Sequence, residues 1–213
     1  MDTTQVISYV LEGAPTTLEI AVGAWLIGSI LGLMLATAQQ PGRLMGFAAA
    51  SVITVLRCIP PLVLLYVVFF GLAQLGFSLP PIPSAAVALG LVEASFTAEY
   101  FRAGFLTVQP SQFEASYSLG LGKVATMRRV VVPQAVIFAV PPLLNSFVGL
   151  LKLATLASAV GAPEVLYRGQ LVFEQSGHIV SVVISIIVLY LVFTIPLTQI
   201  IARLEVRLQK TLR

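Results

Sequence analysis

Long runs of apolar residues without charge dominate the chain. They cover residues 20–42, 58–92, 130–151 and 179–202. A helix crosses the hydrocarbon core of a bilayer with about 20 apolar residues, so the run over 58–92 is too long for one crossing. Three prolines within Leu79–Pro83 end a helix inside that run, because proline lacks the backbone N–H that the next turn needs. The pattern therefore predicts five helices, over about residues 17–40, 50–75, 84–108, 132–160 and 179–203.

The composition supports a membrane protein and excludes several other classes. Of 213 residues, 58% are hydrophobic and 10% are charged, whereas an ordinary soluble domain has about 25% charged residues. Such a chain cannot cover a globule with polar side chains, which rules out a water-soluble monomer. One cysteine and one histidine leave no basis for a disulfide scaffold or a metal cluster. The net charge of +3 is not gathered in one run, so we expect membrane lipid as a partner and no nucleic acid.

The basic residues predict an orientation, because cytoplasmic segments of membrane proteins carry more Lys and Arg. The first eighteen residues contain Asp2 and Glu12 but no Lys or Arg, unlike the start of a signal peptide. We therefore expect a retained first span with the N-terminus outside and, after five spans, the C-terminus inside. The outer segments then hold only Arg168. The inner segments hold Arg43, Lys123, Arg128, Arg129, Arg203, Arg207, Lys210 and Arg213.

A polar segment over 109–131 separates the third and fourth predicted spans. Pro110 and Ser111 are suited to open a short helix, and Gly120 is suited to close it. Phe113 and Tyr117 recur at helical spacing. Periodicity alone leaves two interpretations open, an interfacial anchor among lipid headgroups and a docking helix for a cytoplasmic partner.

The spacing within this segment resembles a known motif. Glu114-Ala115-Ser116 is followed by three residues, Gly120, nine residues and then Val130-Val131-Val132-Pro133. This pattern is similar to the cytoplasmic EAA loop of importer-type ABC transporter permeases, which reads E-A-A, three residues, G, nine residues, I-x-L-P. Ser116 replaces the third residue of E-A-A, and Val130 and Val132 are conservative replacements.

Three further segments resemble the polar amino acid permeases of the histidine, glutamine and arginine type. Residues 57–62 (RCIPPL) resemble R-G-T-P-L-L, and residues 98–104 (AEYFRAG) resemble A-E-x-x-R-G-G. Residues 150–164 (LLKLATLASAVGAPE) resemble L-L-K-D-T-S-L-A-S-x-I-G-x-P-E, although Leu153 and Ala154 stand where the family has Asp and Thr. The resemblance covers about residues 15–205.

This resemblance implies an all-α type I ABC importer permease, a single multi-pass domain over 15–205 in a bacterial inner membrane. Residues 109–131 would form its cytoplasmic coupling loop. Such a chain is no enzyme and holds no cofactor, since a partner dimer of ATP-binding cassette subunits binds ATP and Mg. The other implied partners are a second copy or a homologous permease, a periplasmic or lipid-anchored solute-binding protein, and an amino acid substrate. The ATPase-docking residues implied by the motif are Phe113, Glu114, Ala115, Ser116 and Gly120.

Charged side chains within the predicted spans supply further candidates, because each is costly in hydrocarbon and should face the bundle interior or water. Glu99 and Arg102 are three residues apart on one helix face, and we interpret them as a structural ion pair. Lys152 and Glu93 are substrate-path candidates for the carboxylate and the ammonium of an amino acid, or they satisfy each other or a second subunit. Asn145 and Thr155 would add hydrogen bonds along the path or bridge helices.

Two open points remain in the sequence-based interpretation. Pro141 and Pro142 are expected to interrupt the fourth span, either as a packing kink or where the helix lines a water-filled path. The alternative function is an ion-gradient-driven secondary transporter or channel subunit, which would need no ATPase. Internal repeats typical of such proteins are not visible in the sequence.

Overall fold

The computed structural model describes residues 3–39, 44–177 and 179–211, and helices are the only regular secondary structure within these ranges. In η1 and η2 the helix takes a π-helical turn, and η3 is a 3₁₀-helix. In chain order the elements are α1 (Thr3–Leu11), α2 (Ala14–Ala38), α3 (Leu44–Cys58), α4 (Pro61–Tyr66), η1 (Val67–Gly71), α5 (Leu72–Gln74), α6 (Pro81–Thr107), α7 (Pro110–Ser118), α8 (Lys123–Thr126), η2 (Met127–Val131), α9 (Val132–Leu153), η3 (Ala154–Val160), α10 (Val165–Ser176) and α11 (Ile179–Thr211).

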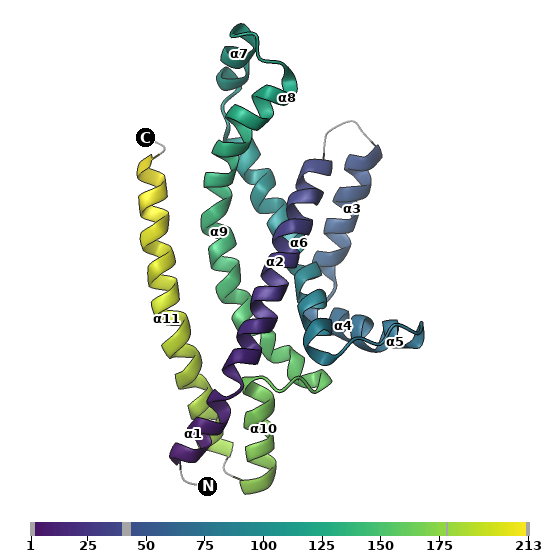
Figure 1. Ribbon diagram of the computed structural model, residues 1–213, viewed down its shortest axis with the longest axis vertical. Helices are drawn as coiled ribbons and strands as arrows, with labels where there is room; N and C mark the ends of the chain where they lie inside the picture. Colours follow the sequence, from purple (N-terminus) through teal and green to yellow (C-terminus); the bar gives the residue numbers. More distant parts are fainter. Residues whose placement is uncertain (1–2, 40–43, 178, 212–213) are drawn as a thin grey trace.

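The fold class predicted from the sequence is confirmed. In the described part of the chain, four helical stretches are long and apolar enough to cross a membrane, namely Gln5–Ala38, Pro81–Thr107, Lys123–Val160 and Ile179–Leu208. A fifth crossing is present if the bent pair formed by α3 and the segment Pro61–Gln74 counts as one span. The long helices run side by side along one axis (Figure 1).

The expected helix over 50–75 differs from the observed structure. Helix α3 already begins at Leu44, and the chain bends by 103° between Cys58 and Pro61. Pro60 has an extended ψ of 136° and no N–H to continue the α3 ladder, while Pro61 stands at the first position of α4, where proline is tolerated. The apolar run alone could not locate this break, because both halves are hydrophobic. Segment α4–α5 consequently projects sideways from the bundle (Figure 1).

The fourth span is not broken at Pro141 and Pro142, where the sequence predicted an interruption. Helix α9 continues through both prolines. Membrane helices tolerate interior prolines when neighbouring helices and local adjustments compensate the lost hydrogen bonds. The deviations from α-helical geometry lie at the two ends instead, in η2 and η3.

The pair α2 and α6 forms the most extensive helix contact of the bundle. Glycine makes this close approach possible, since a Cβ atom at Gly28 would lie 2.5 Å from the Cβ of Glu93. One turn further, a Cβ atom at Gly32 would lie 2.5 Å from the Cβ of Thr97 and 2.8 Å from the carbonyl oxygen of Ala94. Small residues at such a spacing let membrane helices pack backbone to backbone. This pair is the rigid centre on which the other spans pack.

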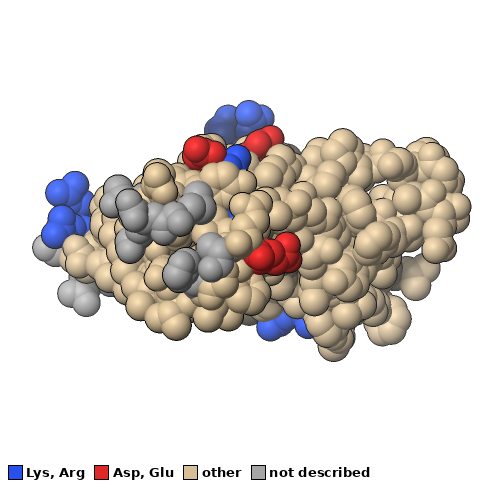
Figure 2. All heavy atoms as spheres, turned by 90° about the horizontal axis from the view of Figure 1, so that it is seen from below, with Lys and Arg blue, Asp and Glu red and all other residues tan. Residues whose placement is uncertain are grey.

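The two ends of the bundle carry different small elements. Helices α7 and α8 form a hairpin at one end, whereas α1 and α10 lie at the other end, near the N-terminus (Figure 1). Apolar contacts of Val10, Val165 and Val182 join α1, α10 and α11 into a second core. Viewed from this end, charged side chains are few and scattered over a mostly uncharged surface (Figure 2).

Replacing Gly32 by Ala should therefore destabilise the chain. The added Cβ atom would overlap Thr97 and the backbone of α6, and overpacking of a dense core costs about 1–3 kcal/mol. Thermal unfolding of the purified protein in detergent measures the effect as a lower Tm. The matched control is Gly149→Ala in α9, where the new Cβ atom meets no heavy atom within 4 Å. Equal Tm values for the two variants would contradict this account of the α2–α6 contact.

Candidate functional site

Helix α7 is a short, well-terminated element at the tip of the bundle. It begins after the extended Gln109 with Pro110 at its first turn. At its end the amide of Gly120 donates to the Tyr117 carbonyl at 2.9 Å, and the amide of Leu121 donates to the Ser116 carbonyl at 3.0 Å. Gly120 has φ of +77°, the left-handed conformation that closes a helix and that only glycine adopts without cost. The chain thereby turns sharply from α7 into α8.

The sequence-predicted docking residues do not all face the same way. Glu114, Ala115 and Gly120 are exposed, Phe113 is half-buried, and Ser116 is buried with its hydroxyl donating to the Gln112 carbonyl at 2.7 Å. Of the five residues, Ser116 thus supports the hairpin from within and is not available to a partner in this arrangement.

Sequence reasoning missed large apolar side chains beside the exposed acid. Leu119 and Val124 are each 81% exposed, and Tyr117 is half exposed. We call the surface formed by Glu114, Ala115, Tyr117, Leu119 and Val124 the hairpin surface. Apolar side chains exposed together beside a polar rim are typical of a surface that another protein covers.

A basic cleft adjoins the hairpin surface, with which it shares Val124. It has a volume of about 860 Å³ and is lined by Gly122, Lys123, Val124, Ala125, Arg128 and Arg129. The cleft borders η2, the π-helical turn that connects α8 to α9. From Lys123 to Val160 the helical path is continuous. A displacement of the hairpin would therefore be passed directly to α9.

The charged residues of the predicted spans occur in two settings, on the surface of the bundle and enclosed within it. Arg102 donates from Nη2 and Nε to Oε2 of Glu99 at 2.6 and 2.9 Å, and both side chains remain partly exposed. The guanidinium of Arg57 lies 5.2 Å from the centre of the Phe96 ring, a cation–π contact.

Glu93 is enclosed between helices. Its side chain is 4% exposed, Thr97 donates a hydrogen bond to its Oε1 at 3.1 Å, and Gly28 packs against its Cβ. The hydroxyl of Ser146 on α9 also faces the carboxyl group. Glu93 of α6 therefore contacts α2 by packing against Gly28 and α9 through the Ser146 hydroxyl.

The remaining path candidates lie on an open face of α9. Asn145 and Lys152 are exposed and seven residues apart, which places them on one side of the helix. Gly149 lies between them with open space around it. Thr155 is half-buried and donates to the Lys152 carbonyl at 2.8 Å. Asn145, Gly149 and Lys152, which we call the α9 face, are separated from the enclosed Glu93, and no ion pair of the described residues joins Glu93 to Lys152.

Glu164 is the polar residue that sequence reasoning underestimated. It is 0% exposed, and its carboxylate accepts hydrogen bonds from the amides of Leu166 at 2.9 Å and Tyr167 at 2.7 Å, which caps α10. Burial raises the pKa of Glu164 from 4.5 to about 7, although these two hydrogen bonds lower it. An acidic residue before a helix is a known capping signal, but its burial could not be inferred from the sequence.

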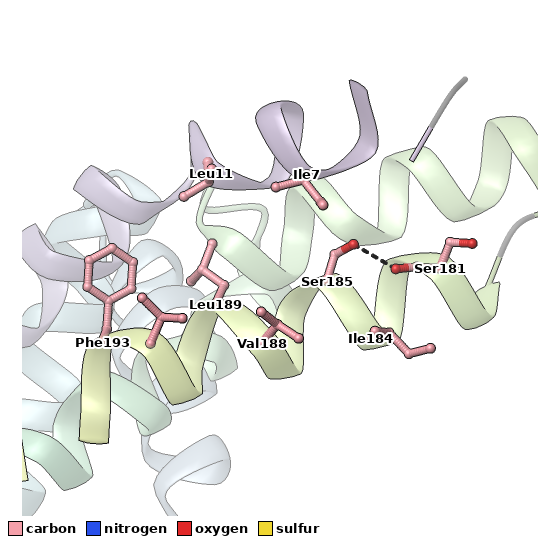
Figure 3. A pocket seen from close by; sticks show the side chains of 9 residues that line it. Ile7, Leu11, Ser181, Ile184, Ser185, Val188, Leu189 and Phe193 are labelled. Carbon is pink, nitrogen blue, oxygen red and sulfur yellow. Dashed lines mark hydrogen bonds between the residues drawn. The ribbon is translucent and has the colours of Figure 1, made fainter. Parts of the chain in front are cut away.

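Apolar cavities flank α11 and are unsuited to a charged solute. One has a volume of about 360 Å³ between α1 and α11, and Ile7, Leu11, Val188 and Phe193 point into it (Figure 3). Its polar groups are serine hydroxyls, of which Ser185 donates back to the Ser181 carbonyl at 2.7 Å. The hairpin surface and the α9 face are therefore the stronger functional candidates.

The chain is similar to membrane components of binding-protein-dependent transport systems and to amino acid permeases. The model of the family described as "Binding-protein-dependent transport system inner membrane component" matches residues 28–210. The probable glutamine ABC transporter permease GlnM of Bacillus subtilis (strain 168) is 33% identical, over 89% of this chain and 86% of that protein. The L-cystine transport system permease TcyL of the same organism is also 33% identical, over 83% and 77%.

Solved structures show the same architecture. A crystal structure of an amino acid ABC transporter with histidines has a chain with a TM-score of 0.89 and 28% identity, with 97% of this chain and 99% of that chain covered. The methionine ABC transporter MetNI, in an inward-facing conformation, has a TM-score of 0.76 at 22% identity, with 93% and 95% covered. The second likeness concerns the fold alone.

Replacing Gly120 by Ala should loosen the end of α7. An alanine in the left-handed region costs about 1–2 kcal/mol, so local opening becomes about 5–30 times more frequent. Hydrogen exchange measured by mass spectrometry should show this increase in the peptide that contains Gly120 and Leu121. Gly122→Ala is the matched control, because Gly122 has φ of −67° and no heavy atom within 4 Å of an added Cβ. Unchanged exchange in the Gly120 variant would refute a glycine-dependent turn.

Proposed function

The chain belongs to the family of binding-protein-dependent transport system inner membrane components, and from this premise we propose that it is the permease subunit of an ATP-driven amino acid importer. The family places it as a multi-pass protein of the inner membrane. Relatives named for glutamine and L-cystine transport support an amino acid as the substrate. The single observation that carries the coupling proposal is the hairpin surface, an exposed acid among exposed apolar side chains at the end of a continuous helix.

In this proposal the hairpin surface docks into a separate ATP-binding subunit, and two such subunits bind ATP and Mg. Exposed Leu119 and Val124 would be covered by the partner, and Glu114 would make a polar contact there. The bias of basic residues supports a cytoplasmic position of the hairpin. Lys123, Arg128 and Arg129 line the adjacent cleft, whereas Arg168 lies at the other end of the bundle.

Closure of the ATPase dimer would act on α9 through rigid-body motion. The continuous helical path from Lys123 to Val160 has 38 residues. At a rise of 1.5 Å per residue it is roughly 57 Å long. Such an element transmits a movement at one end of the bundle to the other end without local unfolding. The geometry thus supports a lever that alternates the two openings of a transport path.

The α9 face is the proposed lining of that path, at the contact with a second permease subunit. A polar side chain cannot face lipid at low cost, so Asn145 and Lys152 need water, a substrate or a partner subunit. Lys152 is suited to the carboxylate of an amino acid. Glu93 is buried on α6 and packed against Gly28 of α2, so we assign it to helix packing.

The opposite end is the proposed docking region for a solute-binding protein. Phe77, in the connection between α5 and α6, is strongly exposed there, as is Leu75. Helix α10 carries further exposed side chains, among them Phe173 and Glu174.

Reconstitution tests the proposed function against the gradient-driven alternative. Proteoliposomes should contain this chain with its co-expressed ATPase and binding protein, and uptake of radiolabelled glutamine, cystine and histidine should be measured. We expect uptake of at least one of these amino acids only when ATP is supplied on the cytoplasmic side of the membrane and the binding protein is present on the other side. Uptake by this chain alone, driven by a sodium or proton gradient without ATP, would overturn the proposal.

Glu114→Lys should weaken assembly with the ATPase. Removing one partner of a charged contact at an interface and reversing its sign should lower the affinity by about 30-fold or more. Co-purification from mild detergent and binding of the isolated ATPase to the reconstituted chain measure this loss. Glu174→Lys is the matched control, since it makes the same charge change at an exposed site on α10, far from the hairpin (Figure 1). Full co-purification with the Glu114 variant would exclude Glu114 from the docking contact.

A further inference from the structure

Two contacts join the beginning of α10 to the segment where α1 turns into α2. A Cβ atom at Gly13 would lie 2.6 Å from the backbone of Glu164 and Val165, so glycine permits the two segments to touch. The amide of Val165 donates to Oγ1 of Thr17 at 3.3 Å, and this hydroxyl donates to the Gly13 carbonyl at 3.2 Å. The carboxylate of Glu164 lies inside this junction and caps α10.

An exposed ion pair reinforces the junction from outside. Nη1 of Arg168 lies 2.6 Å from Oε2 of Glu12, and its guanidinium lies 5.2 Å from the centre of the Tyr9 ring. Arg168 thus holds α10 against α1, one turn beyond the Glu164 cap. Because Glu12 is largely exposed to solvent, this ion pair contributes less to the stability of the junction than the buried contacts do.

We propose that Glu164 is a proton-sensitive latch: its buried carboxyl group holds α10 on the α1–α2 turn most firmly when it is protonated, and its ionisation shifts the equilibrium toward an open junction in which the group is hydrated. The titratable and charged groups around it are Tyr190 on α11, Arg168 on α10, and Tyr9 and Glu12 on α1. From α2, Thr17 supplies a hydroxyl. Of these, the Tyr190 hydroxyl faces Thr17 and interacts with the Glu164 charge.

The direction of the pH response follows from linkage. The pKa of Glu164 is about 7 in the closed junction and 4.5 when the group is exposed. The closed junction therefore binds the proton more tightly, and its stability is complete below pH 4.5 and falls as the pH rises through 7. Between pH 6 and pH 8, the fraction of open junctions should increase by about tenfold.

The latch is a property of the fold, but its consequence for transport rests on the proposed function. If α10 contacts a solute-binding protein, Glu164 is a positioning residue that fixes the orientation of this contact. Release of α10 at higher pH would then weaken docking without affecting the ATPase at the other end of the bundle.

Thiol labelling tests the latch in the full chain. Val10 on α1 is 0% exposed and packs in the same core as Val165, whereas Ser8 on the same helix is exposed. In a Cys58→Ser background, Val10→Cys and Ser8→Cys variants in lipid nanodiscs are labelled with a maleimide. Dividing the two rates removes the pH dependence of the thiol itself. This ratio should rise about tenfold from pH 6 to pH 8.

Two further variants assign the response to Glu164. The ratio should become independent of pH in Glu164→Gln and should remain pH-dependent in Glu174→Gln, which removes an exposed carboxylate of the same helix. A flat ratio in the parent chain, or an equal rise in Glu164→Gln, would overturn the latch. If Glu164→Gln does not fold, the pH profile of the parent chain decides. A labelling ratio that keeps rising with pH and does not level off near pH 7 contradicts the latch. Labelling involves no ATPase and no substrate, so its failure is distinguishable from failure of the proposed function.

Discussion

Hydrocarbon offers no hydrogen-bonding partner, and this constraint governs almost every feature of the bundle. Backbone groups pair within helices, and the hydroxyls of Ser95 and Ser146 donate to carbonyls of their own helices at 2.6 and 2.8 Å. Trp25 donates from Nε1 to the Leu143 carbonyl at 2.8 Å, which ties α2 to α9. Polar side chains that are exposed on the bundle, such as Asn145 and Lys152 of the α9 face, therefore mark places that need water or another protein.

The same solvent removes the hydrophobic force between spans, so close packing has to hold them together. Glycine supplies it between α2 and α6, where Gly28 and Gly32 bring the backbone against Glu93 and Thr97. A side chain packed in this way has one arrangement and resists small displacements. The α2–α6 pair is consequently the fixed frame, and movement is more readily accommodated at the two ends, in the hairpin and in the junction around Glu164.

The sequence predicted the features that depend on local chemistry. Apolar runs located the spans, and the spacing around Glu114 and Gly120 located a short helix closed by a glycine. It failed where the outcome depends on neighbouring helices. Pro141 and Pro142 looked like an interruption, but α9 absorbs them, whereas Pro60 and Pro61 bend the chain by 103° within an equally apolar run. For Glu93 the sequence left open whether the side chain faces the bundle interior or water, and for Glu164 it did not predict burial. Both outcomes depend on close approaches at glycines distant in the sequence, Gly28 and Gly13.

One helical path connects the two candidate regions. From the hairpin, the chain runs through α9 and η3 to Val160, and Gly161, with φ of +81°, then turns it toward Glu164. A lever that moves α9 must therefore either carry the Glu164 junction with it or bend the chain at Gly161. Helix α9 and η3 share one hydrophobic core with α2 and α6, and the Trp25–Leu143 hydrogen bond joins α2 to α9. Bending at Gly161 would let α9 move against α2 and α6 and would break these contacts, whereas the junction, which is bonded to the α1–α2 turn, already belongs to the same packed unit. Carrying the junction along preserves every one of these contacts, so we expect α2, α6, α9 and the junction to move together as one rigid body.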